Sequence, residues 1–220
     1  MAVDYRGFGW STGFPSEQGL IIDGITTVKW ALEVAKIPPE KIVVIGHSLG
    51  TQVASAVVES FAEKGIEFAG VLLISGFTDM ATLLTSYAIG GWLPLLAPFR
   101  QYSALQKWYT GFVVDKWDSG TRIANFVRIS KRVRLTIIHA RDDYEIPYRN
   151  SEAMFAVAVN ATTSTGMELD LLNKMKARDT VDMGNGAFIS TWKAGGNKII
   201  REQIVPYGGG LMLNEPLSAV

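Results

Sequence analysis

The chain has 220 residues, 48% of them hydrophobic and 19% charged, which suits one globular domain with a sizeable core. Lys and Arg together number 21, as do Asp and Glu, so no overall field favours nucleic acid or an anionic membrane. The chain contains no cysteine, which excludes disulfides and thiolate metal sites. Its first residues, Met1-Ala2-Val3-Asp4, lack the basic flank and apolar core of a signal peptide.

The first quarter of the chain predicts a strand, a helix, a strand and a helix. Residues 2–4 are typical of a strand end, and a glycine-rich loop follows. Ser16 is a good N-cap for a helix that we expect to run to about Ala35, because apolar residues recur there near helical spacing. Residues 41–45 predict a short β-branched strand buried on both faces. Ser48 then begins the next helix.

Residues 77–130 form the longest stretch without a strand signal. They follow a second predicted buried strand, residues 68–75, and are apolar, aromatic and rich in helix formers, so we expect an inserted helical cap. No residue from Met80 to Phe99 is charged, and about 20 such residues can span a membrane, but glycines and prolines interrupt this stretch. Helical pieces that line an apolar pocket or lie on a membrane surface fit better.

The remaining chain predicts two strands with two helices between them. These elements are expected at residues 133–140, 148–159, 167–177 and 198–205. Gly184-Asn185-Gly186 has turn chemistry. Apolar strands that alternate with helices predict an α/β fold with a parallel sheet. We therefore expect a single domain, residues 1–220, with a core of residues 1–76 and 131–220.

The pentapeptide Gly46-His47-Ser48-Leu49-Gly50 stands between a predicted strand and a predicted helix. In this context G-x-S-x-G is typical of a nucleophile elbow, a tight turn that small residues permit and that projects its serine above the sheet. The start of the following helix offers free N–H groups to a developing negative charge. We expect Ser48 to be a nucleophile and the Leu49 N–H an oxyanion donor.

A second motif, residues 139–147, places carboxylates just after a predicted strand and before Ile-Pro. Asp143 is our choice for the acid that orients a catalytic base, with Asp142 as the alternative. A polar turn that only ends the strand is the structural alternative. His139 is expected to be a packed histidine at the strand end, and a substitute base is the less favoured interpretation.

These motifs resemble an α/β-hydrolase of the monoacylglycerol and lysophospholipid lipase-like branch. The matching segments, in family order, are Asp4-Tyr5-Arg6-Gly7-Phe8-Gly9 with Ser11-Thr12-Gly13, residues 46–50, residues 139–147 and Val205-Pro206-Tyr207-Gly208. The resemblance implies an α/β-hydrolase fold and a serine hydrolase that acts on lipid esters through an acyl-enzyme. It implies no cofactor or metal, and it allows peripheral association with a membrane.

The chain departs from that family pattern in two ways. The family histidine would fall at Gly210, and His47 is a poor substitute because the residue before the nucleophile usually points away from the site. The family's first three strands are also lacking, and with them a loop that supplies the second oxyanion donor. In the family strand order, one edge of the strand at residues 42–45 would then be unpaired. We expect esterase activity near background for the chain as written.

The apolar stretch of the expected cap supplies candidate acyl-chain contacts, namely Trp92, Leu96 and Phe99, although packing of the cap on the sheet would use the same residues. A second interpretation is that the chain is a non-catalytic lipid-binding or interaction protein with the hydrolase scaffold. Basic residues cluster between Arg122 and Arg134, but the balanced net charge argues against nucleic-acid binding. The sequence carries no signal for a compartment or an oligomeric state.

Overall fold

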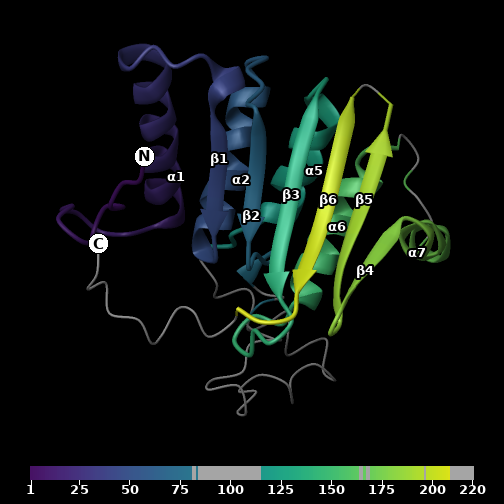
Figure 1. The fold of residues 1–220 in the computed structure, drawn as a ribbon. Coiled ribbons are helices and arrows are strands. Elements are labelled where there is room, and N and C mark those ends of the chain that lie inside the picture. The colour runs from purple at the N-terminus through teal and green to yellow at the C-terminus, as the bar shows by residue number, and fades with distance from the viewer. Residues whose placement is uncertain (81–82, 84–114, 164–165, 167–168, 196, 209–220) are drawn as a thin grey trace, which may run out of the picture.

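The computed structural model describes residues 1–80, 83, 115–163, 166, 169–195 and 197–208. Helices and strands alternate along most of this chain (Figure 1). They are α1 (Glu17–Lys29), a π-helical turn (Trp30–Val34), a 3-10 turn (Pro39–Lys41), β1 (Val43–His47), α2 (Leu49–Ala62), β2 (Gly70–Ile74), α5 (Ser119–Ile129), β3 (Val133–Ala140), α6 (Arg149–Asn160), α7 (Leu169–Arg178), β4 (Thr180–Gly184), β5 (Ala187–Ala194) and β6 (Lys198–Val205).

The strands form one six-stranded sheet in the order β1-β2-β3-β6-β5-β4. β1, β2, β3 and β6 are parallel, whereas β5 and β4 join antiparallel at one side. The expected mostly parallel α/β sheet is therefore confirmed, and β3 and β6 have the predicted bounds. Their register runs from Val133 opposite Lys198 to Ala140 opposite Val205. The carboxyl ends of all four parallel strands consequently lie at one edge of the sheet.

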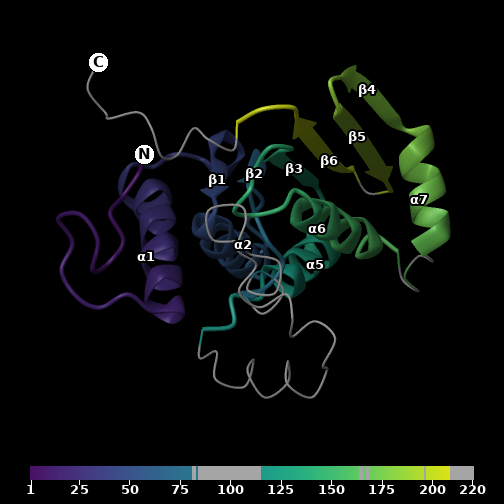
Figure 2. The same ribbon diagram turned by 90° about the horizontal axis from the view of Figure 1, so that it is seen from below.

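Helices α2, α5 and α6 lie along one face of the sheet, and α1 lies beside α2 (Figure 2). Between these helices and the sheet lies the hydrophobic core, in which Val58, Ile123, Ile137 and Ile200 are fully buried. Each such aliphatic side chain contributes about 1.5–3 kcal/mol by leaving water. This layer fixes the strand ends from which the site is built.

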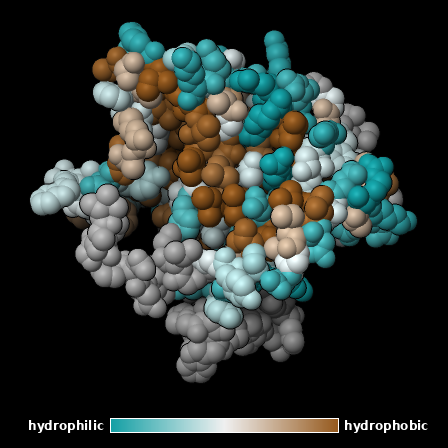
Figure 3. Space-filling model, viewed as in Figure 1, coloured by the Kyte–Doolittle hydropathy of each residue, from teal (hydrophilic) through white to brown (hydrophobic). Residues whose placement is uncertain are grey.

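The other face of the sheet is apolar and open over β1 to β3 (Figure 3). The expected burial of β1 on both faces is wrong, since Val43 is 53% and Ile45 62% exposed. No helix of the described chain covers this face, which explains the exposure. The strand end predicted at residues 2–4 is also wrong: this segment pairs with no strand among the residues that the structure describes, and a strand requires a partner.

The β4–β5 hairpin is an element that the sequence analysis missed. Its connection at Asn185-Gly186 has φ of 53° and 76°, and two positive φ angles are what a type I′ hairpin turn requires. The predicted turn at residues 184–186 is therefore confirmed, and it connects the two antiparallel strands of a hairpin. β4 is short and mostly exposed, and its apolar residues Val181 and Met183 are both 60% exposed, so the four-residue alternation Thr180–Met183 is a weak strand signal.

Only part of the expected cap lies within the described residues. α5, which is the last part of the expected cap, packs against α2. Residues 84–114 lie outside, and with them Trp92, Leu96 and Phe99, the expected substrate contacts. Among the helices that are described, none is long and apolar enough to cross a membrane.

A buried ion pair ties α7 to the sheet. The Glu202 side chain is fully buried on β6, and the Lys176 ammonium lies 2.7 Å from its Oε2. That ammonium also lies 5.5 Å from the ring centre of Phe155 and 5.2 Å from that of Phe188. Within the described chain, neither carboxylate oxygen has a hydrogen bond of favourable geometry. Lys176 is therefore the main compensation for burying this carboxyl group.

Replacing Glu202 with Gln is expected to flatten the dependence of the unfolding free energy on pH. Burial raises the pKa of Glu202, and Lys176 opposes that rise. Because the unfolded chain releases this proton first as the pH rises, the free energy of unfolding falls through the interval between the unfolded and folded pKa values, by about 1.4 kcal/mol per pH unit. Urea unfolding at several pH values from about 4 to about 8 measures this slope. Glu33→Gln, on an exposed position, is the control, and equal slopes in all three proteins would contradict the prediction.

Candidate functional site at the carboxyl edge of the sheet

Ser48 lies at the turn between β1 and α2 with φ 50° and ψ −121°. An L-residue rarely adopts this conformation, and holding one there costs about 1–3 kcal/mol. Hydrogen bonds fix the turn: the Ser48 N–H donates to the Ile74 carbonyl over 2.9 Å, and the Thr51 N–H and hydroxyl both donate to the Ser48 carbonyl. The surrounding structure thus holds the predicted elbow serine in a strained backbone.

The glycine at position 46 lets β1 and α2 approach closely behind the elbow. A Cβ at this position would lie 2.5 Å from the Gly50 carbonyl oxygen and 2.8 Å from the Ala54 Cβ. Real Cβ atoms do not approach backbone that closely, so a larger residue would push the helix away from the strand. A Cβ added to Gly50, by contrast, would have the Tyr5 hydroxyl as its nearest neighbour, at 3.9 Å. Gly46 therefore sets the sharpness of the turn.

Replacing Ser48 with Gly is expected to stabilise the protein, by about 1 kcal/mol, because glycine adopts this backbone without the steric penalty. Ser48→Ala removes the same hydroxyl but keeps a Cβ, so it should leave the stability nearly unchanged. Thermal unfolding of both variants against the parent measures the difference. A higher melting temperature for Ala than for Gly would show that the backbone at position 48 is not strained.

Leu49 is the first residue of α2. The first N–H groups of a helix have no carbonyl one turn earlier to bind, and they lie at the positive end of the helix dipole. The Leu49 N–H, adjacent to Ser48, is therefore available to a negatively charged oxygen that forms at this edge. The Leu49 N–H stays a predicted oxyanion donor.

Asp143 lies in the turn after β3, at the same edge of the sheet. Its Oδ1 accepts hydrogen bonds from the N–H groups of Glu145 (3.1 Å) and Ile146 (2.9 Å). Burial raises the pKa of Asp143, but hydrogen bonds from His139 and from these N–H groups outweigh it and leave the pKa below its ordinary value. Asp143 is thus held as a carboxylate, which is the state that an orienting acid needs.

The chain's two histidines are both placed by the structure. His139 is fully buried, as expected of a packed strand-end residue, and both ring nitrogens have partners. His47 is half-buried at the end of β1. Burial lowers its pKa, and the nearby charge of Asp143 opposes this change. The ends of β1 and β3 therefore lie within electrostatic reach of each other, although β2 separates them.

The loop after β6 begins beside the acid turn. The Arg141 N–H donates to the Val205 carbonyl over 2.8 Å, so the two strand ends leave the sheet side by side. Gly210, the expected histidine position, lies outside the described residues. The described geometry brings Ser48 and Asp143 to one edge, and the chain after β6 leaves the sheet at that edge.

Residues 1–175 match the family model described as "Alpha/beta hydrolase family". The chain belongs to this family. A solved structure with the same fold is an alpha-beta hydrolase from Vibrio vulnificus, which has a TM-score of 0.54 and 21% sequence identity, and whose match covers 70% of this chain and 50% of that one.

Two similar proteins show how much of a relative this hydrolase spans. Protein ABHD12B of Homo sapiens is 31% identical over 166 residues, which cover 73% of this chain and 42% of that protein. The lysophosphatidylserine lipase ABHD12 of Danio rerio is 27% identical over 179 residues, which cover 78% of this chain and 42% of that protein. This chain therefore spans less than half the length of these two relatives.

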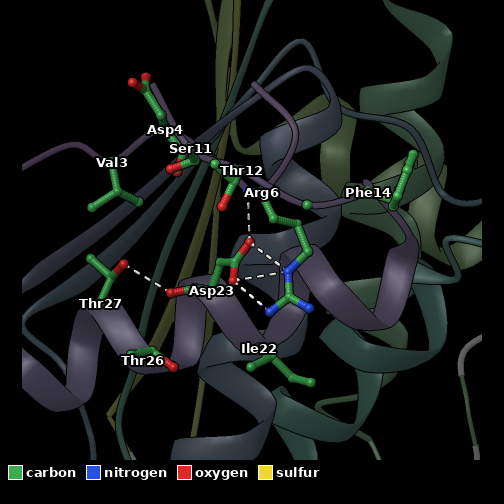
Figure 4. Close-up of a pocket in the computed structure, with 11 residues that line it drawn as sticks. Val3, Asp4, Arg6, Ser11, Thr12, Phe14, Ile22, Asp23, Thr26 and Thr27 are labelled. Carbon is green, nitrogen blue, oxygen red and sulfur yellow. Dashed lines mark hydrogen bonds and ion pairs between the residues drawn. The ribbon is translucent and has the colours of Figure 1, made fainter. Parts of the chain in front are cut away.

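A polar pocket of about 520 Å³ lies between residues 3–14 and α1 (Figure 4), and Ser48 is not among the residues that line it. Its charged centre is the pair formed by Arg6 and Asp23, in which the guanidinium reaches both carboxylate oxygens, at 2.7–3.1 Å. The Arg6 N–H also donates to Asp23 over 2.9 Å. Because these charges satisfy each other, the pair fastens the loop to the helix. Arg6 belongs to the motif at residues 4–9, whereas its partner Asp23 lies outside every predicted motif and no sequence pattern indicates the pair.

Proposed function

We propose that this α/β hydrolase has the site of a serine hydrolase of carboxylic esters, with Ser48 as nucleophile, the Leu49 N–H as oxyanion donor and Asp143 as orienting acid. The observation that carries the proposal is the strained backbone of Ser48 at the strand-to-helix turn. Strained backbone of this kind clusters at active sites, where the surrounding structure holds it in place. The family membership supports the same chemistry.

The reaction would proceed in two steps. The Ser48 oxygen attacks the acyl carbon while a base takes its proton, and the alcohol leaves with that proton, so that an acyl-serine ester remains. Water, deprotonated by the same base, then attacks this ester and releases the carboxylic acid and the free serine. Asp143 would hold the imidazole of the base. We place that base at position 210, where this chain has Gly210.

The proposed substrate is a lipid ester such as a monoacylglycerol or a lysophospholipid. Two observations support it: relatives that carry the name lysophosphatidylserine lipase, and the apolar residues Trp92, Leu96 and Phe99 between β2 and α5. The test is release of fatty acid from dispersed monoacylglycerol and lysophospholipid by a Gly210→His protein. Ser48→Ala in the same background is the control. Turnover of a short soluble ester without turnover of either lipid would refute the lipid assignment alone.

A non-catalytic lipid-binding protein is the second candidate. His139 favours it, because neither of its ring nitrogens is free to take a proton from Ser48. On this alternative the unmodified chain binds a fluorescent fatty acid, and Ser48→Ala binds it equally well. Binding that depends on the Ser48 hydroxyl would count against the alternative.

A further inference from the structure

His139 is a buried histidine that the proposed reaction does not use. It stands near the end of β3, fully buried, between the acid turn and α6. Its Nδ1 lies 2.6 Å from the hydroxyl of Ser151, which is itself fully buried. Its Nε2 lies 2.7 Å from the Ile146 carbonyl and 3.3 Å from Oδ2 of Asp143. Both polar atoms of the buried ring are thus satisfied, and the Asp143 carboxylate is a third polar neighbour.

These partners determine which nitrogen carries a hydrogen. A carbonyl oxygen can only accept, so Nε2 must donate to Ile146. Oδ2 of Asp143 lies 3.3 Å from the same Nε2 and is a second, more distant acceptor beside it. In the neutral ring Nδ1 is then an acceptor, and the Ser151 hydroxyl donates to it. The Ile146 carbonyl therefore fixes the tautomer of His139, and Ser151 helps to hold the orientation of the ring, as a second partner does for metal-bound histidines.

The consequence falls on the two oxygens of Asp143. Oδ1 is occupied by the N–H groups of Glu145 and Ile146, whereas Oδ2 faces only His139 among its described hydrogen-bonding and ion-pair partners. A carboxylate oxygen can accept two hydrogen bonds, so Oδ2 keeps one acceptor position for a base. His139 thus bridges both halves of the turn, through the Ile146 carbonyl and the Asp143 carboxylate.

We propose that His139 is a positioning residue, which holds the Asp143 carboxylate in one orientation and favours its charged form through the Nε2–H. This proposal rests on the proposed function only for the role of Asp143 as orienting acid. The contacts of His139 with Ser151, Ile146 and Asp143, which we call the clamp, do not depend on catalysis. Other ionisable groups around it are His47 on β1, and Glu202 on β6 with its partner Lys176. The same geometry excludes His139 as a substitute base.

The test is a carbon-13 NMR titration of the aspartate carboxyl groups, with the Asp143 signal assigned by its loss in Asp143→Asn. His139→Leu fills similar volume but cannot donate, so the Asp143 midpoint should move upward in pH. His139→Gln retains an amide donor near the position of Nε2 and should restore the midpoint. An unchanged midpoint in a folded His139→Leu protein would overturn the proposal.

Ser151→Ala tests the clamp if His139→Leu does not fold. It leaves the ring in place but removes its orienting partner, so the Asp143 midpoint should move in the same direction by a smaller amount. An unchanged midpoint in Ser151→Ala would then overturn the proposal. In a Gly210→His background, His139→Leu should lower kcat about 10- to 100-fold at little change in KM. Absence of activity in every variant would refute the proposed function and leave the titration result valid.

Discussion

A histidine introduced at position 210 is expected to raise ester hydrolysis by this protein about 10²- to 10⁴-fold, the usual contribution of a general base. The reason is that Ser48 and Asp143 stand at one edge of the sheet, and the chain leaves β6 beside the acid turn. Neither histidine of the parent sequence supplies this base in the proposed site. The measurement is the initial rate of p-nitrophenyl acetate hydrolysis by the parent and by Gly210→His.

Three matched variants separate the proposed mechanism from simpler explanations. Gly210→Ala tests whether any side chain at this position has an effect. Ser48→Ala and Asp143→Asn, each combined with Gly210→His, should return the rate to background. A Ser48-dependent rate in the parent protein would show that another group serves as base. A folded Gly210→His protein without a rate increase would refute our placement of the histidine.

Replacing Gly46 with Ala is expected to lower the free energy of unfolding by about 3 kcal/mol, near the upper end of typical overpacking effects. The added Cβ would meet backbone atoms of Gly50 at 2.5–2.8 Å, and neither β1 nor α2 can yield without losing core contacts. Urea unfolding measures the loss. The melting temperature should fall in parallel, by about 2–4 °C for each kcal/mol.

Gly50→Ala is the matched control, because both glycines belong to the same pentapeptide. Its Cβ would find nothing nearer than 3.9 Å, and alanine is the better helix former. We expect a gain of about 0.5–1 kcal/mol, opposite in sign to the effect at Gly46. If both substitutions lowered the free energy of unfolding equally, the close contact behind Gly46 would not be the cause of the loss.

The parallel part of the fold could be predicted because its strands carry their own signals. β3 and β6 are rich in Ile and Val and are bounded by turn residues, and both were predicted with the bounds that the structure shows. β4 could not be identified in this way, since it is a short strand at the sheet edge and its side chains are mostly exposed. The Asn185-Gly186 pair was the available signal for the hairpin, and it depends on backbone conformation rather than on hydrophobicity.

The candidate site was predictable where a role depends on residues near in sequence. The elbow is one pentapeptide, and the strain at Ser48 follows from its place between strand and helix. The bridge from His139 to Ser151 joins residues 12 apart through a side chain that any core could contain, so no local pattern indicates it. Likewise, the burial of Glu202 against Lys176 depends on where α7 packs. Tertiary contact, rather than sequence spacing, determines these pairs.

The strand order has a consequence for how the molecule is assembled. β6 is the last strand in sequence, yet it lies between β3 and β5. The β4–β5 hairpin can form locally as soon as it is synthesised, but it has no place in the sheet until β6 has paired with β3 along its full length. Pairing across such sequence distances is slow. On the ribosome, the completed sheet therefore awaits residues 198–205, and until then the edge of β3 is open to incorrect partners.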